Sequence, residues 1–291
     1  MTYNLVLTED GSPTLKDEES GELYHNRAGA YLEALVNYVL PSAALKSLNR
    51  TESQLKVLDV CFGLGYNSLV LIEEALKHAC SGSISFTAID KNLELLLLIP
   101  EIIGSGKFPF LQEILEKNEG QGLAQLMCEH RLGGGSKNLI FDIEVIEGTL
   151  EEQIQKIHDD FDLIFHDPFS PKRAPELWTA DIFGMYQKLL RNRKGAVLTY
   201  SSASAVRGGL REVGFEVRKT TALGGKSGGT IAMISAESAH FSFSELGEDE
   251  AKKLDSVSGV PYRSEGFGTD RPSILRTRTE EQAQYKRLGK D

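Results

Sequence analysis

The hydrophobic positions of this chain form short apolar runs, and amphipathic stretches lie between most of them. Short apolar runs bounded by turn residues predict buried strands, whereas apolar residues at helical spacing predict helices. We expect strands over Leu55–Cys61, Ile84–Ile89, Leu139–Ile146, Phe161–His166, Ala196–Tyr200, Phe215–Arg218 and Thr230–Ser235. We expect helices over Arg27–Leu40, Asn67–Ala79, Asn92–Ile103, Leu150–His158, Pro175–Leu190 and Ala203–Val213.

Strands that alternate with helices predict crossover units and a mainly parallel sheet. The last two strands are joined by the Gly-rich segment Leu223–Gly229 without a helix, which favours an antiparallel pair. The expected fold is α/β and Rossmann-like, with a mostly parallel seven-stranded sheet and a terminal antiparallel pair, as in class I S-adenosylmethionine-dependent methyltransferases. We expect a lead-in and helix over 1–50, the Rossmann-like domain over 51–236 with a helical and mobile-loop insertion at 104–138, and a tail over 237–291 packed on the domain.

The first of these strands ends in a Gly-rich turn, Asp59-Val60-Cys61-Phe62-Gly63-Leu64-Gly65-Tyr66-Asn67. Such a turn lets a ligand approach the backbone, and the next helix offers its first N–H groups. A dinucleotide site would have a third glycine where Asn67 stands, which disfavours NAD or FAD and favours S-adenosylmethionine. Asp59 is a candidate partner for the ammonium group of the methionine part, directly or through water. The alternative is a tight turn with a packing role only.

Two further strand ends carry candidate cofactor residues. Asp90 ends the second strand, where an acid suits hydrogen bonding to ribose hydroxyls, although it could instead cap the helix that follows. Thr149 follows the third strand and either caps the next helix or faces the adenine. Because these strand ends meet at the carboxyl edge of a parallel sheet, we expect them to line one cleft.

The fourth strand ends in His166-Asp167-Pro168-Phe169, which resembles the D/N-P-P-aromatic signature of enzymes that methylate exocyclic amines. A carboxylate and a backbone carbonyl can accept the N–H hydrogens of an amine and aim its lone pair at a methyl donor. Asp167 is therefore the candidate catalytic residue, and Phe169 offers a ring on which a base can stack. The alternative is an ordinary Asp-Pro turn.

Composition narrows the class of protein. The three cysteines lack a CxxC spacing and the six histidines are dispersed, so we expect neither disulfides nor a metal site. The longest apolar run, Leu95–Pro100, is too short to span a bilayer and the start of the chain lacks a signal-peptide pattern, so a soluble cytoplasmic protein is expected. The net charge is −10, yet residues 170–230 hold eleven basic and four acidic residues, or 11 − 4 = +7. This segment is either a solvated face or a phosphate-facing surface.

The stretch Phe161–Thr179, with its Asp-Pro-Phe-Ser-Pro and Ala-Pro-Glu-Leu-Trp segments, resembles the methyltransferase domain of the bacterial tRNA 5-methylaminomethyl-2-thiouridine biosynthesis enzymes. Ser20–Ala30, Phe62–Asn67, Ser201–Leu210 and Pro261–Arg263 are also similar. The resemblance implies S-adenosylmethionine-dependent N-methylation of the 5-aminomethyl group of (2-thio)uridine at the tRNA wobble position. Asp167 would orient and deprotonate the amine, and Phe169 would contact the uracil. The anticodon loop would meet the basic segment and residues near the site, namely Tyr24, His25, Lys172, Arg173, Arg207 and Lys226.

Several positions depart from the family pattern. No second dinucleotide fingerprint is present, so the oxidase of the fused members is expected to be absent and a separate enzyme to supply the amine. The family usually has Gly-Asp where Gly148-Thr149 stands, and only Lys226 remains of its Gly-x-Lys-Arg motif. Tyr24 and His25 either line the site or anchor the amino-terminal segment. Two other functions stay open: a methyltransferase of small-molecule amines, and a catalytically inactive module that binds S-adenosylmethionine or RNA.

Overall fold

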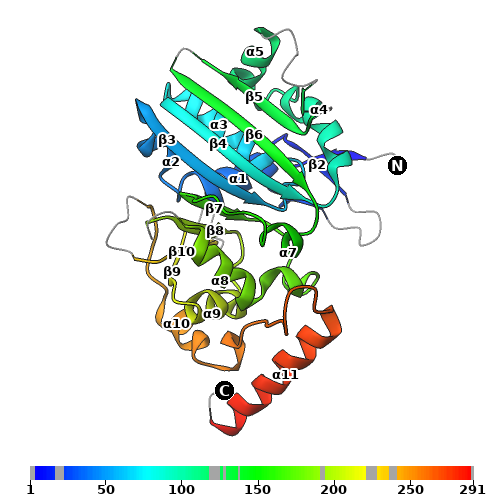
Figure 1. Cartoon of the computed structure of the whole chain (residues 1–291), viewed down its shortest axis with the longest axis vertical. Helices are drawn as coiled ribbons and strands as arrows, with labels where there is room; N and C mark the ends of the chain where they lie inside the picture. The colour runs from blue at the N-terminus through cyan, green and yellow to red at the C-terminus, as the bar shows by residue number, and fades with distance from the viewer. Residues whose placement is uncertain are drawn as a thin grey trace. The chain divides into compact units, whose positions relative to one another are not determined.

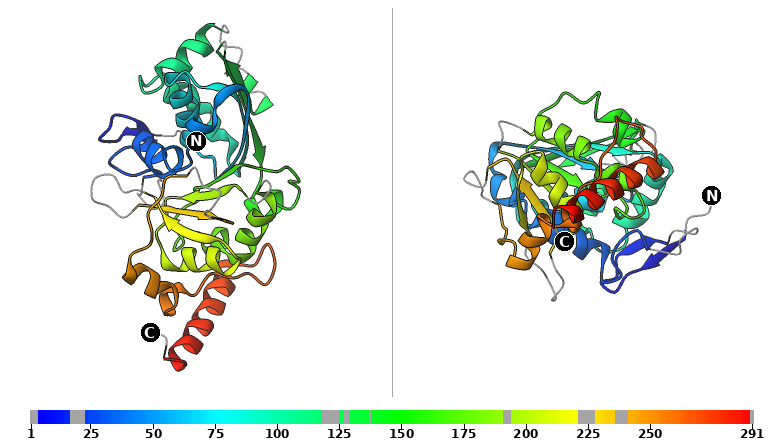
Figure 2. Two further views of the ribbon diagram at one scale, coloured as in Figure 1. Left: turned by 90° about the vertical axis from the view of Figure 1, so that its left-hand side faces the viewer. Right: turned by 90° about the horizontal axis from the view of Figure 1, so that it is seen from below.

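The computed structural model describes residues 4–16, 23–117, 125–126, 129–136, 138–190, 194–220, 228–235 and 241–289. The chain divides into two compact units, Met1–Gly148 and Thr149–Asp291 (Figures 1 and 2). Each unit contains part of the predicted α/β pattern and is described by itself. In the described ranges, no helix is both long and apolar enough to cross a membrane.

The first unit is built on a four-stranded run with the order β5-β6-β4-β3. Strands β3, β4 and β6 are parallel, and β5 pairs antiparallel with β6. The helices of this unit lie on one face of the strands (Figures 1 and 2). Its elements are β1 (Leu5–Leu7), β2 (Pro13–Leu15), α1 (Ala30–Ala34), the π-helix η1 (Leu35–Val39), α2 (Ala44–Ser47), β3 (Asn49–Val60), α3 (Tyr66–Lys77), β4 (Ser81–Asp90), the 3₁₀-helix η2 (Leu93–Leu98), α4 (Ile99–Ile103), α5 (Pro109–Lys117), β5 (Arg131–Gly135) and β6 (Leu139–Glu147).

The second unit contains strands in the order β7-β8-β10-β9. Strands β7 and β8 are parallel, whereas β10 is antiparallel to both β8 and β9. The predicted antiparallel pair at the end of the sheet is therefore confirmed. Its elements are α7 (Leu150–Gln153), β7 (Leu163–His166), the 3₁₀-helix η3 (Pro175–Trp178), α8 (Ala180–Leu189), β8 (Ala196–Thr199), α9 (Ser204–Glu212), β9 (Glu216–Lys219), β10 (Thr230–Met233), α10 (Glu248–Leu254), the 3₁₀-helix η6 (Val257–Gly259) and α11 (Arg271–Arg287).

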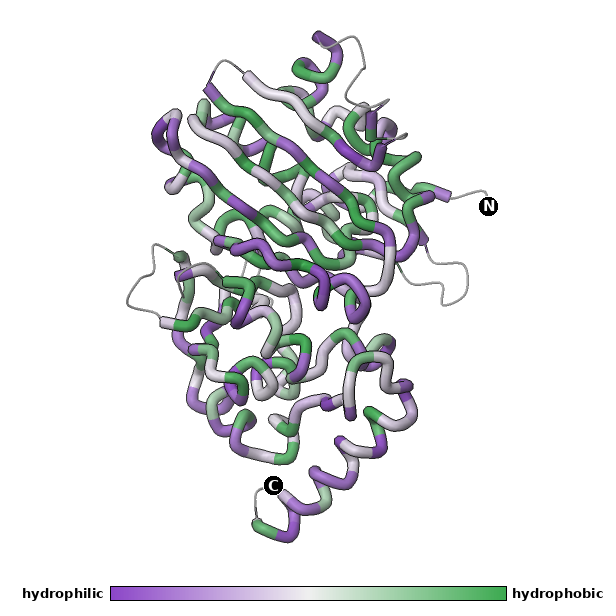
Figure 3. The backbone as a smooth tube through the Cα atoms, in the orientation of Figure 1, coloured by the Kyte–Doolittle hydropathy of each residue, from purple (hydrophilic) through white to green (hydrophobic). Residues whose placement is uncertain are grey.

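All seven predicted strands are present, as β3, β4, β6, β7, β8, β9 and β10. Polar and apolar residues alternate along β6 and its neighbours, as the colours in Figure 3 show. The buried positions of β6 are Leu139, Phe141, Ile143 and Val145. Strand β3 begins earlier than predicted, at Asn49, because its first residues are polar and exposed and so carry no hydrophobic signal. The helix predicted over Leu150–His158 is shorter, and α7 ends at Gln153.

Strand β5 differs from expectation, since the Gly-rich end of the 104–138 insertion was predicted to be a mobile loop. A Cβ atom on Gly134 would lie 2.7 Å from the Phe141 ring, and one on Gly135 would lie 2.6 Å from the Leu139 carbonyl oxygen. Real Cβ contacts are never this short, so only glycine permits the close pairing of β5 with β6. Gly134 and Gly135 therefore serve strand packing.

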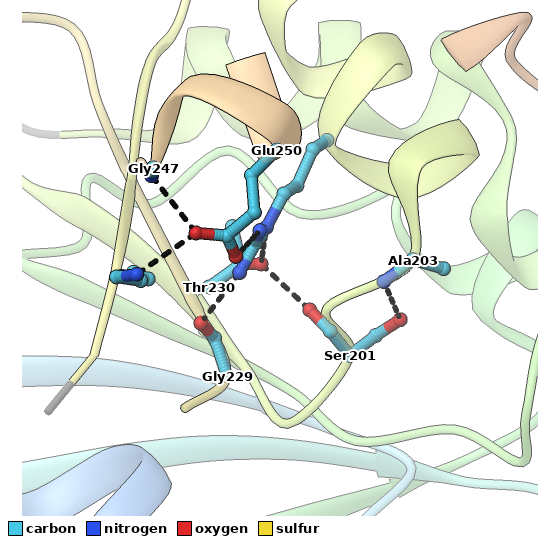
Figure 4. A network of polar contacts seen from close by, with 8 residues as sticks. Ser201, Ala203, Gly229, Thr230, Gly247 and Glu250 are labelled. Carbon is cyan, nitrogen blue, oxygen red and sulfur yellow. Dashed lines mark hydrogen bonds and ion pairs between the residues drawn. The ribbon is translucent and has the colours of Figure 1, made fainter. Parts of the chain in front are cut away.

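The carboxyl-terminal segment packs on the second unit through charged side chains. Arg207 of α9 is almost fully buried, with a relative exposure of 2%. Its Nε donates to the Thr230 hydroxyl oxygen at 2.9 Å, its Nη2 donates to the Gly229 carbonyl at 3.2 Å, and its Nη1 pairs with Glu250 Oε1 at 2.8 Å (Figure 4). Lys219 donates to the other oxygen of Glu250 at 2.8 Å. Helix α10 is thereby tied to α9 and to the end strands.

This network corrects one sequence prediction. Arg207 was expected to face tRNA, but its guanidinium is buried and each of its nitrogens donates inside the protein. A buried arginine that already has internal acceptors offers no surface to a phosphate. Arg207 therefore has a structural role.

We expect the Glu250→Gln substitution to lower the free energy of unfolding at pH 7 by about 1–3 kcal/mol, between the values for exposed and buried ion pairs. Hydrogen bonds from Lys219 and Arg207 lower the pKa of Glu250 from 4.5 to about 2. A carboxyl group with a lowered pKa stabilises the fold above its unfolded pKa, and the effect is lost as the pH falls through the folded value. The difference between wild type and variant should thus shrink between about pH 4.5 and pH 2, as urea unfolding at several pH values can measure.

Glu248→Gln is the matched control, because Glu248 is exposed in the first turn of the same helix. It should change the free energy of unfolding by less than about 0.5 kcal/mol. Equal stability of wild type and Glu250→Gln at pH 7 would contradict the tethering role of Glu250.

Candidate functional site

The loop between β3 and α3 turns sharply through three residues with positive φ, which are Cys61 (62°), Gly63 (56°) and Gly65 (75°). The backbone N–H groups of Cys61 and Phe62 both donate to the Ile89 carbonyl, at 3.0 and 3.1 Å. A Cβ on Gly65 would lie 2.7 Å from the Phe62 ring, so glycine is required there. Sequence reasoning did not single out Cys61, which adopts a conformation that favours glycine.

Gly63 is a different case from Gly65. The only described atom near a Cβ built on Gly63 is the Cys61 carbonyl oxygen, at 3.8 Å. Gly63 therefore leaves its backbone accessible on the side where a side chain would stand. This open side is what a ligand that packs against the loop backbone requires.

Asp90, at the end of β4, ties the second strand end to this loop. Its Oδ2 accepts the Gly63 N–H at 2.7 Å, and its Oδ1 accepts the Asn92 N–H at 2.8 Å. Burial raises the pKa of Asp90, and a partly desolvated carboxylate gains from further hydrogen-bond donors such as ribose hydroxyls. The capping role that the sequence left open belongs to Asn92, whose side chain accepts the Glu94 N–H at the start of η2.

Asp59 and Asn67 lie beneath the loop. Asp59 has no exposed surface, and its Oδ2 accepts the Ser68 hydroxyl of α3 at 2.5 Å. In this conformation Asp59 can act on a ligand only through another group. Of the two predicted modes of contact with the ammonium group of the methionine part, this agrees with the one through water. Asn67 is 6% exposed in the first turn of α3.

Tyr24 and His25 anchor the amino-terminal segment beside the start of α3. The Tyr24 N–H donates to the Leu15 carbonyl at 2.9 Å, and His25 Nδ1 lies 2.8 Å from the Thr14 hydroxyl. The His25 ring stands edge-on to Tyr66, with centroids 4.8 Å apart, and Tyr66 directly follows Gly65. Burial lowers the pKa of His25 to about 4, so this side chain is neutral at physiological pH. The anchoring alternative is thus realised, and a role in the active site stays a prediction.

Thr149, the first residue of the second unit, forms a capping box at α7. Its hydroxyl accepts the Glu152 N–H at 3.3 Å, and the Glu152 carboxylate accepts the Thr149 N–H at 3.4 Å. The hydroxyl therefore serves the helix start. A contact between Thr149 and adenine stays a prediction.

The loop after β7 carries the candidate catalytic residues. Asp167 and Phe169 are half-buried, and Pro168 between them is buried. The guanidinium of Arg173 lies over the Phe169 ring, 4.0 Å from its centroid. Lys172 is exposed next to it. Four of the eight residues predicted to meet the acceptor or its anticodon loop thus lie in one segment of the second unit: Asp167, Phe169, Lys172 and Arg173.

Two aromatic side chains that sequence reasoning did not assign to the site hold this loop. The Trp178 indole Nε1 donates to the Phe169 carbonyl at 2.8 Å, and the Tyr200 hydroxyl donates to the Pro168 carbonyl at 2.9 Å. Trp178 belongs to the Ala-Pro-Glu-Leu-Trp segment, whose resemblance to the family does not by itself indicate a contact with this loop. Tyr200 is the last residue of a predicted strand, and this position is the only sequence feature that indicates a place near the loop.

His166 precedes Asp167 and is fully buried, with its Nδ1 2.7 Å from the Tyr186 hydroxyl. Burial lowers the pKa of His166 to about 3. It is therefore neutral and part of the core, where its ring meets Trp178 edge-on with centroids 4.6 Å apart.

Four of the eight described basic residues in the segment over 170–230 form ion pairs with acidic residues of their own unit. Besides Arg207 and Lys219, Arg211 pairs with Asp255, and Arg218 pairs with Glu216 and Glu245. Its positive charge is thus partly neutralised by the tail. Lys226, Arg191 and Arg193 lie outside the described residues.

Comparisons with known proteins agree with this geometry. Residues 111–235 match the family model of an S-adenosyl-L-methionine-dependent methyltransferase. An uncharacterised protein of Methanocaldococcus jannaschii is 29% identical over 97% of this chain and 73% of its own length. The tRNA 5-methylaminomethyl-2-thiouridine biosynthesis bifunctional protein MnmC of Cupriavidus necator is 26% identical over 78% of this chain. The match covers 34% of that protein, so the chain spans about a third of the length of this relative.

The crystal structure of MnmC2 from Aquifex aeolicus superimposes with a TM-score of 0.74 and 28% identity, over 97% of this chain and 86% of that one. The chain is an S-adenosyl-L-methionine-dependent methyltransferase with a Rossmann-like fold. It is similar to the MnmC proteins of two Cupriavidus species and to MnmC2, at 26–28% identity over 78–97% of its own length. Its cofactor is S-adenosylmethionine, and the open side of Gly63 next to the Asp90 carboxylate fits such a ligand.

We expect Gly63→Ala and Gly65→Ala to separate ligand binding from folding. An alanine at either positive φ costs about 1–2 kcal/mol. Gly65→Ala adds a clash with Phe62, for a total of about 2–4 kcal/mol. Gly63→Ala adds no clash within the protein, but its methyl group should weaken S-adenosylmethionine binding on the order of tenfold or more. Urea unfolding and titration calorimetry measure the two effects.

Gly106→Ala is the control for backbone strain, because Gly106 has a φ of 83° and no described atom within 4 Å of a built Cβ. It should lose stability as Gly63→Ala does and bind S-adenosylmethionine normally. Wild-type affinity in Gly63→Ala would rule out the loop as the cofactor site.

Proposed function

We propose that this chain transfers a methyl group to the 5-aminomethyl nitrogen of uridine or 2-thiouridine at the wobble position of tRNA. The observation that carries the proposal is the Asp167-Pro168-Phe169 loop at the end of β7, held in place in a chain related to MnmC. The names of the MnmC relatives specify a tRNA 5-methylaminomethyl-2-thiouridine product. A tRNA substrate also agrees with the predicted cytoplasmic location, and the aminomethyl acceptor would come from a separate enzyme.

The proposed chemistry assigns distinct tasks to the two units. S-Adenosylmethionine supplies a methyl group bound to a positively charged sulfur, and Gly63 and Asp90 of the first unit would hold it. In the second unit, the Asp167 carboxylate accepts N–H hydrogens of the amine and aims the nitrogen lone pair at the methyl carbon. As the new N–C bond forms and the C–S bond breaks, the amine becomes more acidic, and Asp167 can take the proton that leaves it.

Phe169 would bind the uracil ring. Its side chain is half-buried, and the Arg173 guanidinium lies 4.0 Å from the ring centroid as a cation–π pair, beside which a base could stack. A wobble base is already outside a duplex, so its extrusion costs little. Lys172 and Arg173 are then the cations next to the acceptor that can meet anticodon-loop phosphates.

A small-molecule amine is the second candidate substrate. It is favoured by the acidic net charge and by the pairing of Arg207, Arg211, Arg218 and Lys219 with acidic side chains, which reduces the positive surface. Salt separates the two candidates. The affinity for tRNA should fall steeply with salt, whereas binding of a small amine should not.

Methyl transfer to total tRNA from a bacterial strain that lacks this methyltransferase activity tests the proposal. Nucleoside mass spectrometry should show 5-aminomethyl-2-thiouridine converted to its N-methyl form. If no nucleoside gains a methyl group while S-adenosylmethionine binding is demonstrated, the tRNA proposal fails, and the small-amine alternative or the binding module takes its place.

We expect Asp167→Asn to lower kcat on the order of 100-fold or more, because the amide cannot take a proton from the amine. Its affinity for S-adenosylmethionine should stay unchanged. Asp160→Asn is the matched control, since Asp160 is exposed before the same strand. Turnover of Asp167→Asn at the wild-type rate would disprove the catalytic role of Asp167.

A further inference from the structure

The backbone of the loop over residues 167–169 leaves the sheet at the end of β7. A residue before proline is biased towards extended conformations, which favours a chain that continues away from the strand at Asp167. Buried carbonyl groups need hydrogen-bond donors, and here the two carbonyls that follow Asp167 receive theirs from side chains. The donors are Tyr200 and Trp178.

We propose that Tyr200 and Trp178 are positioning residues that orient Asp167 and Phe169 toward the acceptor. Their two hydrogen bonds fix consecutive peptide groups, so the carboxylate before them and the ring between them have defined directions. Trp178 is fully buried and stands edge-on to Tyr200 with centroids 5.9 Å apart, so each donor also supports the other. This inference rests on the proposed function, in which Asp167 and Phe169 meet the amine and the base.

The Tyr200 hydroxyl has a second consequence for the acceptor. A carbonyl oxygen has two lone pairs, and Tyr200 uses one of those on Pro168. The donated hydrogen bond holds the direction of the other lone pair. That lone pair, with the Asp167 carboxylate, can accept the two N–H hydrogens of a primary amine and leave its nitrogen lone pair directed at the donor.

The segment that contains Tyr200 is itself held by hydrogen bonds from buried side chains. The Ser201 carbonyl accepts the Thr230 hydroxyl at 2.6 Å, and the same hydroxyl oxygen accepts Arg207 Nε at 2.9 Å (Figure 4). Buried hydrogen bonds in series stiffen one another. The buried Arg207 thus acts on the acceptor loop through Thr230 and Ser201, and Ser201 directly follows Tyr200 in the sequence.

Tyr200→Phe is the direct test, because it removes one hydroxyl group and keeps the ring. We expect kcat to fall about 10- to 100-fold, the loss that misplacement of a reacting group causes. The KM for S-adenosylmethionine should stay within about twofold, because the hydroxyl that is removed donates to the acceptor loop. If Tyr200 had only a structural role, the substitution would lower the stability of the protein but would not lower kcat selectively over the KM for S-adenosylmethionine.

Trp178 provides an independent readout, since it is the only tryptophan of the chain. In the wild type its indole is fully buried, so acrylamide should quench its fluorescence slowly. Tyr200→Phe should loosen the loop and increase the quenching rate constant about twofold or more. Tyr262→Phe is the control, because Tyr262 is a buried tyrosine of the same unit and no hydrogen bond of its hydroxyl to the loop is among those described.

The outcomes separate this inference from the proposed function. If wild type methylates tRNA and Tyr200→Phe retains both kcat and slow quenching, the positioning role is overturned. If wild type does not methylate tRNA, the proposed function fails, and the quenching comparison alone then decides whether Tyr200 holds the loop. Faster quenching in Tyr200→Phe but not in Tyr262→Phe supports the positioning role in either case.

Discussion

Backbone that leaves a strand loses its sheet partners and must find other hydrogen bonds, and both candidate loops of this protein are shaped by that requirement. In the first unit, the Ile89 carbonyl accepts two loop amides and the Asp90 carboxylate accepts a third. In the second unit, Trp178 and Tyr200 donate to two loop carbonyls. A loop with satisfied backbone groups is preorganised, so its side chains and open faces are already placed when a ligand arrives.

The sequence predicts the strands well because their cores are apolar and their neighbours are turns. The same reasoning finds the candidate loops, since Gly63, Gly65, Asp90 and Asp167 all lie at or after strand ends. It fails where geometry, not hydrophobicity, decides. The run Gly133-Gly134-Gly135 looks like a flexible loop until the nearby Phe141 ring and Leu139 carbonyl show why no side chain fits at Gly134 and Gly135.

The charge pattern of the sequence predicted the surface of the protein least well. A run of cations reveals nothing about acidic partners that are remote in sequence, and Arg207 meets Glu250 across 43 positions. The acidic tail neutralises part of the positive segment and also holds α9 and the end strands. Lys172 and Arg173, which lie next to the acceptor loop, therefore support a phosphate-bearing partner better than the net charge of +7 over residues 170–230 does.

Under the proposed function, the loop of the first unit holds the methyl donor and the loop of the second unit holds the acceptor. Hydrogen–deuterium exchange can follow both loops, with S-adenosylhomocysteine added first and aminomethyl-bearing tRNA second. Exchange should become slower at residues 61–65 and near residue 92 after the first addition, and at residues 169–173 only after the second. Slower exchange elsewhere, with residues 61–65 unchanged by S-adenosylhomocysteine, would contradict this assignment of the loops.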